Sequence, residues 1–199
     1  MTRFLALGDS YTIGESVIAD DCWPGMLSKR LGLDETQIIA RTGWTTDELR
    51  AAIDDAHPVG PFDLVTLLIG VNDQYRGRDA QSYRGEFAIL LDRAIAFAGD
   101  DAARVIVVSI PDWSVTPFAS DRDRNQIAAE IDRFNLVNRE EAGRAGAQYA
   151  DIVKVSRQAG HEPELTAADR LHPSSAMYRR WIDIILPAAR VALGRERRA

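Results

Sequence analysis

The stretch Asp63-Leu64-Val65-Thr66-Leu67-Leu68-Ile69 carries the strongest indication of a fold in this sequence. It is apolar, contains β-branched residues and stops at Gly70, which is typical of a strand buried on both faces. Strands of this kind occur in parallel sheets that helices cover on each side. The stretch therefore predicts an α/β fold in which strands alternate with helices.

The sequence on either side of this strand repeats the alternation. Short apolar runs predict four more strands, at residues 4–7, 37–40, 105–110 and 147–153. Apolar residues at helical spacing predict helices over 22–31, 46–56, 83–98, 127–137 and 178–193. Pro187 falls inside the last helix and is expected to kink or split it. Together these elements predict one three-layer α/β/α sandwich with about five parallel strands, a single domain over residues 1–199 that ends in a short basic tail from about residue 194.

Composition bounds the class of protein. The chain has 199 residues, of which 46% are apolar and 27% charged, and this balance is that of an ordinary globular domain. The net charge of -6 makes a nucleic-acid partner unexpected. The one cysteine, Cys22, rules out an intrachain disulfide and fits a reducing compartment. No secretory signal and no run of membrane-spanning length stand out, so we expect a cytoplasmic protein without a membrane span.

Function is expected beyond the carboxyl ends of the strands, because ligands bind there in open parallel sheets. Ser10 follows the first strand in Gly8-Asp9-Ser10, Gly43 follows the second, and Asn72 follows the third. Taken singly, each has an ordinary reading: a serine caps a helix, a glycine joins a loop, and an asparagine forms a turn.

One histidine differs from the other two. We expect His57 and His161 to be surface or otherwise satisfied residues. His172 has Asp169 three residues before it, a spacing that can bring a carboxylate to the imidazole Nδ1–H and leave Nε2 free as a base. A carboxylate that merely caps the loop is the alternative.

The order of these residues along the chain gives them a common interpretation. Ser10 in Gly-Asp-Ser-Tyr, Gly43 in Arg-Thr-Gly-Trp-Thr-Thr, Asn72 in Gly-Val-Asn-Asp and His172 in Asp-Arg-Leu-His-Pro occur in the order of the hallmark residues of one enzyme family. From residue 4 to about 190 the chain resembles the SGNH (GDSL) hydrolases. The resemblance implies a flavodoxin-like sheet of about five strands.

The resemblance also implies a mechanism. Ser10 would attack an ester carbonyl, His172 would take its proton, and Asp169 would orient the imidazole. The oxyanion would be held by the backbone N–H groups of Ser10 and Gly43 and by the side-chain amide of Asn72. The partner implied is a small-molecule ester, and the scheme requires no metal and no other cofactor. The oligomeric state is left open.

Other residues near the strand ends receive secondary roles. We expect Asp9 and Asp73 to be structural, as acceptors for nearby backbone amides, with direct substrate contact as the less favoured alternative. The segment 110–117 is a candidate rim of the pocket. Four aromatic residues are candidates for its walls, some of which are expected to be ordinary packing: Trp44, Tyr75, Trp113 and Phe118.

Three functions remain open at this point. The first is a carboxylesterase for short acyl esters, including O-acetyl groups. The second is a lysophospholipase or thioesterase with a longer acyl pocket. The third, less favoured, is a catalytically silent binding module on the same fold. The Gly-x-Ser-x-Gly elbow, phosphate-binding glycine loops and metal-ligand spacings are absent from the sequence.

Overall fold

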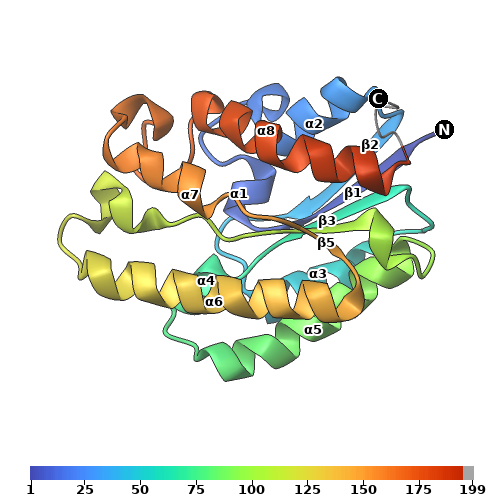
Figure 1. Cartoon of the computed structure of the whole chain (residues 1–199), viewed down its shortest axis with the longest axis horizontal. Helices are drawn as coiled ribbons and strands as arrows, with labels where there is room; N and C mark the ends of the chain where they lie inside the picture. The colour runs from blue at the N-terminus through green and yellow to red at the C-terminus, as the bar shows by residue number, and fades with distance from the viewer. Residues whose placement is uncertain (195–199) are drawn as a thin grey trace.

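A computed structural model describes residues 1–194, and its centre is a five-stranded sheet in which every pairing is parallel (Figure 1). The strand order is β2-β1-β3-β4-β5. The strands are β1 (Arg3–Gly8), β2 (Glu35–Ala40), β3 (Leu64–Leu68), β4 (Val105–Val108) and β5 (Gln148–Ala150). This is the flavodoxin-like order, in which the chain changes direction across the sheet between β1 and β3.

Helices cover both faces of the sheet, which confirms the three-layer α/β/α sandwich predicted from the sequence. One face carries α2 (Trp23–Leu31) and α8 (Ser175–Ala192), which contact each other. The other carries α3 (Thr46–Ala56), α5 (Ala80–Phe97) and α6 (Arg124–Ala145) (Figure 1). Three short helices follow the carboxyl ends of strands: α1 (Ser10–Ile13) follows β1, α4 (Val71–Tyr75) follows β3 and α7 (Val153–Ser156) follows β5.

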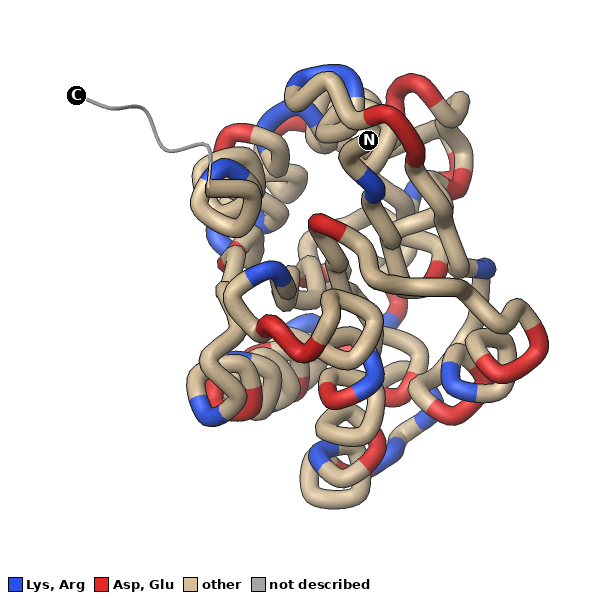
Figure 2. The backbone as a smooth tube through the Cα atoms, turned by 90° about the vertical axis from the view of Figure 1, so that its right-hand side faces the viewer, with Lys and Arg blue, Asp and Glu red and all other residues tan. Residues whose placement is uncertain are grey.

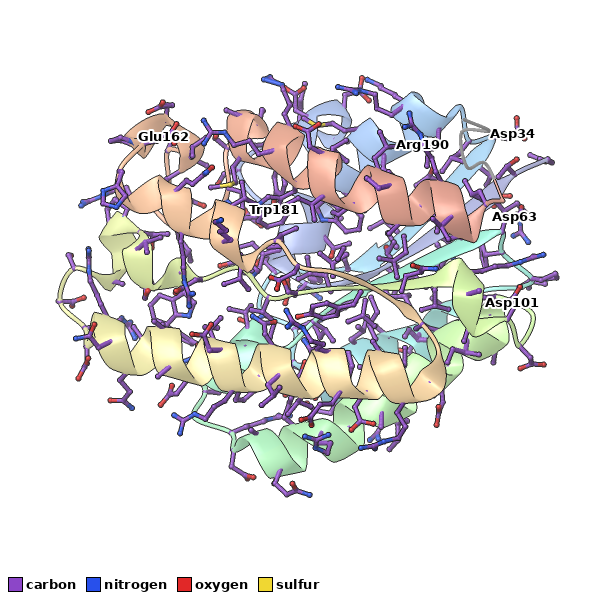
Figure 3. The ribbon with its side chains drawn as sticks, in the orientation of Figure 1. Asp34, Asp63, Asp101, Glu162, Trp181 and Arg190 are labelled. Carbon is purple, nitrogen blue, oxygen red and sulfur yellow. The ribbon has the colours of Figure 1, made fainter. Side chains whose placement is uncertain are left out.

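The core lies between the sheet and the two helical layers. All five residues of β3 are buried, as expected for a central strand covered on both faces. Two tryptophans, Trp23 of α2 and Trp181 of α8, are fully buried on the α2/α8 side of the sheet, and Trp181 is labelled in Figure 3. The sheet is thereby packed between its two helical layers, and the loops of the site project from its carboxyl edge.

Several elements differ in extent from the sequence prediction: β5 ends at Ala150 rather than at residue 153, and α6 continues to Ala145 rather than ending at residue 137. For two further elements the reason can be identified. The fourth strand ends at Val108 rather than at residue 110, because the side chain of Asn135 bonds both the N–H and the C=O of Ile110 at 2.8 and 2.9 Å. Helix α8 is not split at Pro187 but is helical from Ser175 to Ala192. The carbonyl that loses its i+4 donor there belongs to the exposed Asp183, where water can replace the lost bond.

Charged residues lie mostly on the outside of the molecule, with both signs interspersed (Figure 2). Asp34 and Asp63 directly precede β2 and β3, and Asp101 lies just before β4, so the three mark the amino end of the sheet in Figure 3. The functional loops lie at the other end. The predicted basic tail, Arg195, Arg197 and Arg198, lies outside the described residues. Within residues 1–194, no helix combines the length and apolarity required to cross a bilayer.

Candidate active site

Ser10 is the first residue of α1 and stands directly beyond the carboxyl end of β1. Asp9 caps this short helix: its side chain accepts the Tyr11 N–H at 3.0 Å. Gly8 permits the tight entry, because a Cβ there would lie 2.2 Å from the Thr12 hydroxyl and 2.5 Å from a backbone oxygen of β3. The serine is thereby fixed at the start of a helix, where backbone N–H groups have no partner within the helix.

His172 and Asp169 form a close pair in the loop before α8. The imidazole Nδ1 lies 2.6 Å from Asp169 Oδ2, and the other carboxylate oxygen accepts the backbone N–H groups of Leu171 and His172, both at 2.9 Å. An ionised carboxylate at this distance requires the proton on Nδ1, which leaves Nε2 as the acceptor nitrogen. The edge of the Tyr11 ring packs on the imidazole with 5.6 Å between ring centroids.

The charge of Asp169 is stabilised by hydrogen bonds. Partial burial acts to raise the pKa of this carboxyl, but donors from Ser16, Leu171 and His172 outweigh it and hold the pKa well below its ordinary value. Asp169 is therefore an anion across the pH range in which imidazole changes charge. An anion beside Nδ1 is the arrangement that supports a histidine acting as a base.

Gly43 and Asn72 lie in the loops after β2 and β3. Gly43 has φ +89°, a conformation that L residues with side chains rarely adopt. The Asn72 side chain donates one amide N–H to the Trp44 carbonyl at 2.9 Å. Because an amide nitrogen carries two hydrogens, this bond orients Asn72 while leaving a second N–H to donate.

These residues meet around one cavity of about 210 Å³. Its lining comes from the loops after the first four strands and from the loop before α8. The lining residues are Ser10, Tyr11, Thr42, Gly43, Val71, Asn72, Tyr75, Trp113, Phe118, Leu171 and His172. Four of the five residues predicted from the sequence, Ser10, Gly43, Asn72 and His172, thus line one cavity. The fifth, Asp169, is not part of the lining but is hydrogen-bonded to His172.

Three of the four predicted aromatic residues line this cavity. Tyr75, Trp113 and Phe118 form a triangle with ring centroids 5.7 to 6.4 Å apart, and the Arg122 guanidinium lies 5.0 to 5.5 Å from all three ring centroids. The fourth candidate, Trp44, is not part of this lining: it is partly buried and packs against the core, and its carbonyl accepts the hydrogen bond from Asn72.

Asp9 and Asp73 accept backbone amides, as predicted. Asp73 accepts the N–H of Thr46 at 3.0 Å and its hydroxyl at 2.8 Å, which ties the loop after β3 to the start of α3. Both carboxyls are fully buried. Burial raises the pKa of Asp73, and complete burial, aided by the charge of Asp73, raises the pKa of Asp9 to about 8.

Sequence reasoning missed Ser16, whose hydroxyl donates to Asp169 Oδ2 at 2.6 Å. A serine in a polar stretch 153 residues before its partner carries no periodic or motif signal, so only the folded arrangement identifies it. Among the described residues, no group of three or more His, Cys, Asp or Glu side chains is arranged to hold a metal ion.

Comparisons with known proteins agree with this arrangement. The model of the GDSL-like lipase/acylhydrolase family matches residues 6–180. No curated protein matches the sequence.

Solved structures share the fold at low sequence identity. TesA has a TM-score of 0.76 at 21% identity, with 96% of this chain and all of that chain covered. Phospholipase A1 from Streptomyces albidoflavus NA297 has a TM-score of 0.72 at 18% identity, covering 94% and 97%. A carbohydrate acetylesterase family member from Sinorhizobium meliloti has a TM-score of 0.68 at 21% identity, covering 98% and 100%.

The family match extends over most of the chain and includes the loops that carry Ser10, Gly43, Asn72 and His172. This chain therefore belongs to the GDSL-like lipase/acylhydrolase family and is an SGNH-type carboxylic ester hydrolase.

Proposed function

We propose that this hydrolase cleaves esters with short acyl groups, O-acetyl esters among them, through an acyl-enzyme on Ser10. The observation that carries the proposal is the cavity in whose wall Ser10, Gly43, Asn72 and His172 all lie. We propose further that the chain acts as a single domain, because buried residues from all five strands and both helical layers belong to one core.

The chemistry follows from the pairing at His172. A serine hydroxyl is a weak nucleophile at neutral pH and needs an adjacent base. In the proposed reaction His172 Nε2 takes the Ser10 proton as the oxygen attacks the ester carbonyl, and Asp169, 2.6 Å from Nδ1, stabilises the imidazolium. The imidazolium then protonates the departing alcohol. Water repeats the sequence on the acyl-enzyme and releases the acid.

The tetrahedral intermediate places negative charge on the former carbonyl oxygen. The proposed donors to this oxygen are the backbone N–H groups of Ser10 and Gly43 and the free amide hydrogen of Asn72. The bond from Asn72 to the Trp44 carbonyl fixes the amide before the substrate arrives, so little reorganisation is needed in the transition state.

Cavity size supports a short acyl group. A volume of about 210 Å³ lies below the range of roughly 300–1,000 Å³ that drug-sized ligands occupy. The rings of Tyr75, Trp113 and Phe118 form part of its wall. An acetyl or butyryl group and its ester linkage fit such a space, whereas a palmitoyl chain would extend into solvent.

The surroundings support a polar alcohol. A second depression of about 270 Å³ shares Tyr75 and Trp113 with the first cavity. Its other walls are mostly polar and include Gln74, Arg122, Asp123, Gln126 and Glu130. The similar structure from Sinorhizobium meliloti is described as a carbohydrate acetylesterase family member. A sugar or another polyol is therefore the alcohol class that we propose.

A panel of 4-nitrophenyl esters from acetyl to palmitoyl tests the acyl preference. We expect kcat/KM to be highest for acetyl to butyryl and to fall steeply beyond. A rate that rises with chain length would instead support the lysophospholipase or thioesterase alternative. Ser10→Ala should abolish turnover of every ester, whereas Ser82→Ala, a change at an exposed serine of α5, should leave it intact. Turnover by the Ser10→Ala variant would refute the proposed nucleophile.

A further inference from the structure

We propose that Ser16 is a positioning residue for the acid of the triad: its hydroxyl holds the Asp169 carboxylate and sets how strongly that carboxylate stabilises the imidazolium of His172. The inference rests on the proposed function, since it concerns the same triad. It adds a residue that takes no part in bond making.

The contact is specific to one oxygen. The Ser16 hydroxyl donates to Asp169 Oδ2 at 2.6 Å, and this is the oxygen that also receives the imidazole Nδ1–H at 2.6 Å. The other oxygen, Oδ1, receives two backbone N–H groups of its own loop. The hydroxyl of Ser16 is thus the only side-chain donor to Asp169, besides His172, among the described residues.

The backbone at Ser16 is held in an unfavourable conformation. Its φ is +68°, a region in which glycine is at ease and a residue with a Cβ is strained. A strained residue persists where its surroundings fix it, and such residues gather at functional sites. Here the residue present has a hydroxyl group, and that hydroxyl reaches the triad.

The preceding residue makes a parallel connection. Glu15 accepts a hydrogen bond from the hydroxyl of Thr42, which lies beside Gly43. The two consecutive residues 15 and 16 therefore link the loop of the proposed oxyanion donor to the loop of the triad acid. This arrangement gives the strained turn after α1 a role in holding both loops.

The expected consequence follows from charge sharing. A carboxylate oxygen with two donors has less negative charge to offer each of them. Removing the Ser16 hydroxyl leaves the imidazole as the sole side-chain donor, so the carboxylate stabilises the imidazolium more strongly. The base then stays protonated to higher pH, and the carboxylate also loses one of the contacts that fix its orientation.

Two other titratable groups lie near the imidazole, and the Ser16 hydroxyl bonds to Asp169 rather than to either of them. Tyr11 of α1 packs on the ring, and Asp112 lines the small cavity behind it. Asp112 is paired with Arg157 at 2.8 Å. A shift of the pH profile would therefore report on Asp169 and its donors.

Three substitutions separate the hydroxyl from the backbone. Ser16→Ala and Ser16→Gly both remove the hydroxyl, but glycine also relieves the strain at φ +68°. Ser16→Thr keeps the hydroxyl and adds strain, because a β-branched residue is poorly suited to this region. The readouts are the pH profile of kcat/KM for 4-nitrophenyl acetate and the NMR titration of the His172 ring with its Nδ1 proton resonance.

If the hydroxyl positions the acid, the alanine and glycine variants behave alike. In both, the acid limb of the profile should move to higher pH and kcat should fall on the order of 5-fold, the size expected for losing the net contribution of one ordinary hydrogen bond. Ser16→Thr should keep the wild-type profile even though its stability falls.

Two results would overturn the proposal. In the first, the kcat values of the variants follow backbone strain, with Ser16→Gly the most active and Ser16→Thr the least active. In the second, the alanine and glycine variants keep the wild-type pH profile. The NMR titration requires no substrate. If the protein hydrolysed none of the esters, the proposed function would fail, yet a changed titration in the alanine and glycine variants would still support the role of Ser16.

Discussion

Asp9, the residue before the proposed nucleophile, offers a quantitative test of the electrostatics beneath the site. Its carboxyl is completely buried, Oδ1 accepts the Tyr11 N–H, and Oδ2 is buried without a hydrogen-bond partner among the described residues. Burial raises its pKa from 3.8 to about 8. The side chain is therefore a neutral acid in the folded protein near pH 7, although it would be ionised in the unfolded chain.

The sign of the effect on stability follows from proton binding. Between about pH 4 and pH 8 the folded state holds a proton on Asp9 that the unfolded state has released. The free energy of unfolding therefore decreases as pH rises through this window, by about 1.4 kcal/mol per pH unit from this group. The contribution of Asp9 to the free energy of unfolding is fully present below about pH 4, where both the folded and the unfolded chain hold the proton. Between pH 5 and pH 7 the loss amounts to about 2.7 kcal/mol.

The substitution Asp9→Asn removes this dependence. The amide oxygen can still accept the Tyr11 N–H, but the group cannot ionise. Burying the amide without a hydrogen-bond partner lowers the free energy of unfolding by an amount that does not change with pH. The quantity to measure is therefore the slope of the free energy of unfolding against pH. Urea unfolding followed by tryptophan fluorescence at several pH values should give a stability difference, variant minus wild type, that grows by about 1.4 kcal/mol per pH unit.

Asp101→Asn provides the matched control. The exposed Asp101 likewise accepts the N–H of the residue two positions ahead, at 3.1 Å. Its substitution should change stability by an amount that is constant between pH 5 and pH 7. Parallel stability curves for wild type and Asp9→Asn would refute the reasoning, because they would mean that Asp9 is already ionised in the folded protein.

Three further substitutions test individual roles. Asn72→Ala removes one proposed oxyanion donor and should lower kcat by about 10²- to 10³-fold with little change in KM for 4-nitrophenyl acetate. Gly43→Ala meets no atom within 4 Å but strains the backbone at φ +89°, so urea unfolding should show a loss of about 1–2 kcal/mol, accompanied by a lower kcat as the N–H turns away. Phe118→Ala, at a ring that is 37% exposed, opens the cavity and should raise the ratio of kcat/KM for hexanoyl over acetyl esters. An unchanged ratio would place the acyl group elsewhere.

The fold was predictable because its signals are local. The run of residues 63–69 is apolar on both faces, and the packed structure has every residue of β3 buried. Periodicity also located both ends of α3 and α5 within three residues, whereas α6 continues to Ala145, well beyond its predicted end at residue 137. It failed where a distant side chain intervened: Asn135 bonds Ile110 and ends β4 early. At Pro187 the helix is not split, because the carbonyl that loses its donor belongs to Asp183, which is exposed to water.

The site residues that could be predicted are those that belong to short sequence motifs. Ser10, Gly43, Asn72 and His172 stand at strand ends or beside helix starts, and all four line one cavity. Side-chain direction was not predictable from the sequence. Trp44 follows Gly43 directly, yet its ring packs against the core, and its carbonyl accepts a hydrogen bond from the Asn72 side chain. Ser16 was missed because its partner is distant in sequence and its hydrogen bond depends on a strained φ.

The central claim is that Ser10 is the hydroxyl activated by His172. The most direct measurement is mass spectrometry of the protein after reaction with a fluorophosphonate, which traps an activated serine as a covalent adduct. We predict a single adduct on Ser10, formed in the wild type and strongly slowed by His172→Ala. An adduct on another serine, or a Ser10 that stays unmodified while the enzyme hydrolyses esters, would contradict the account.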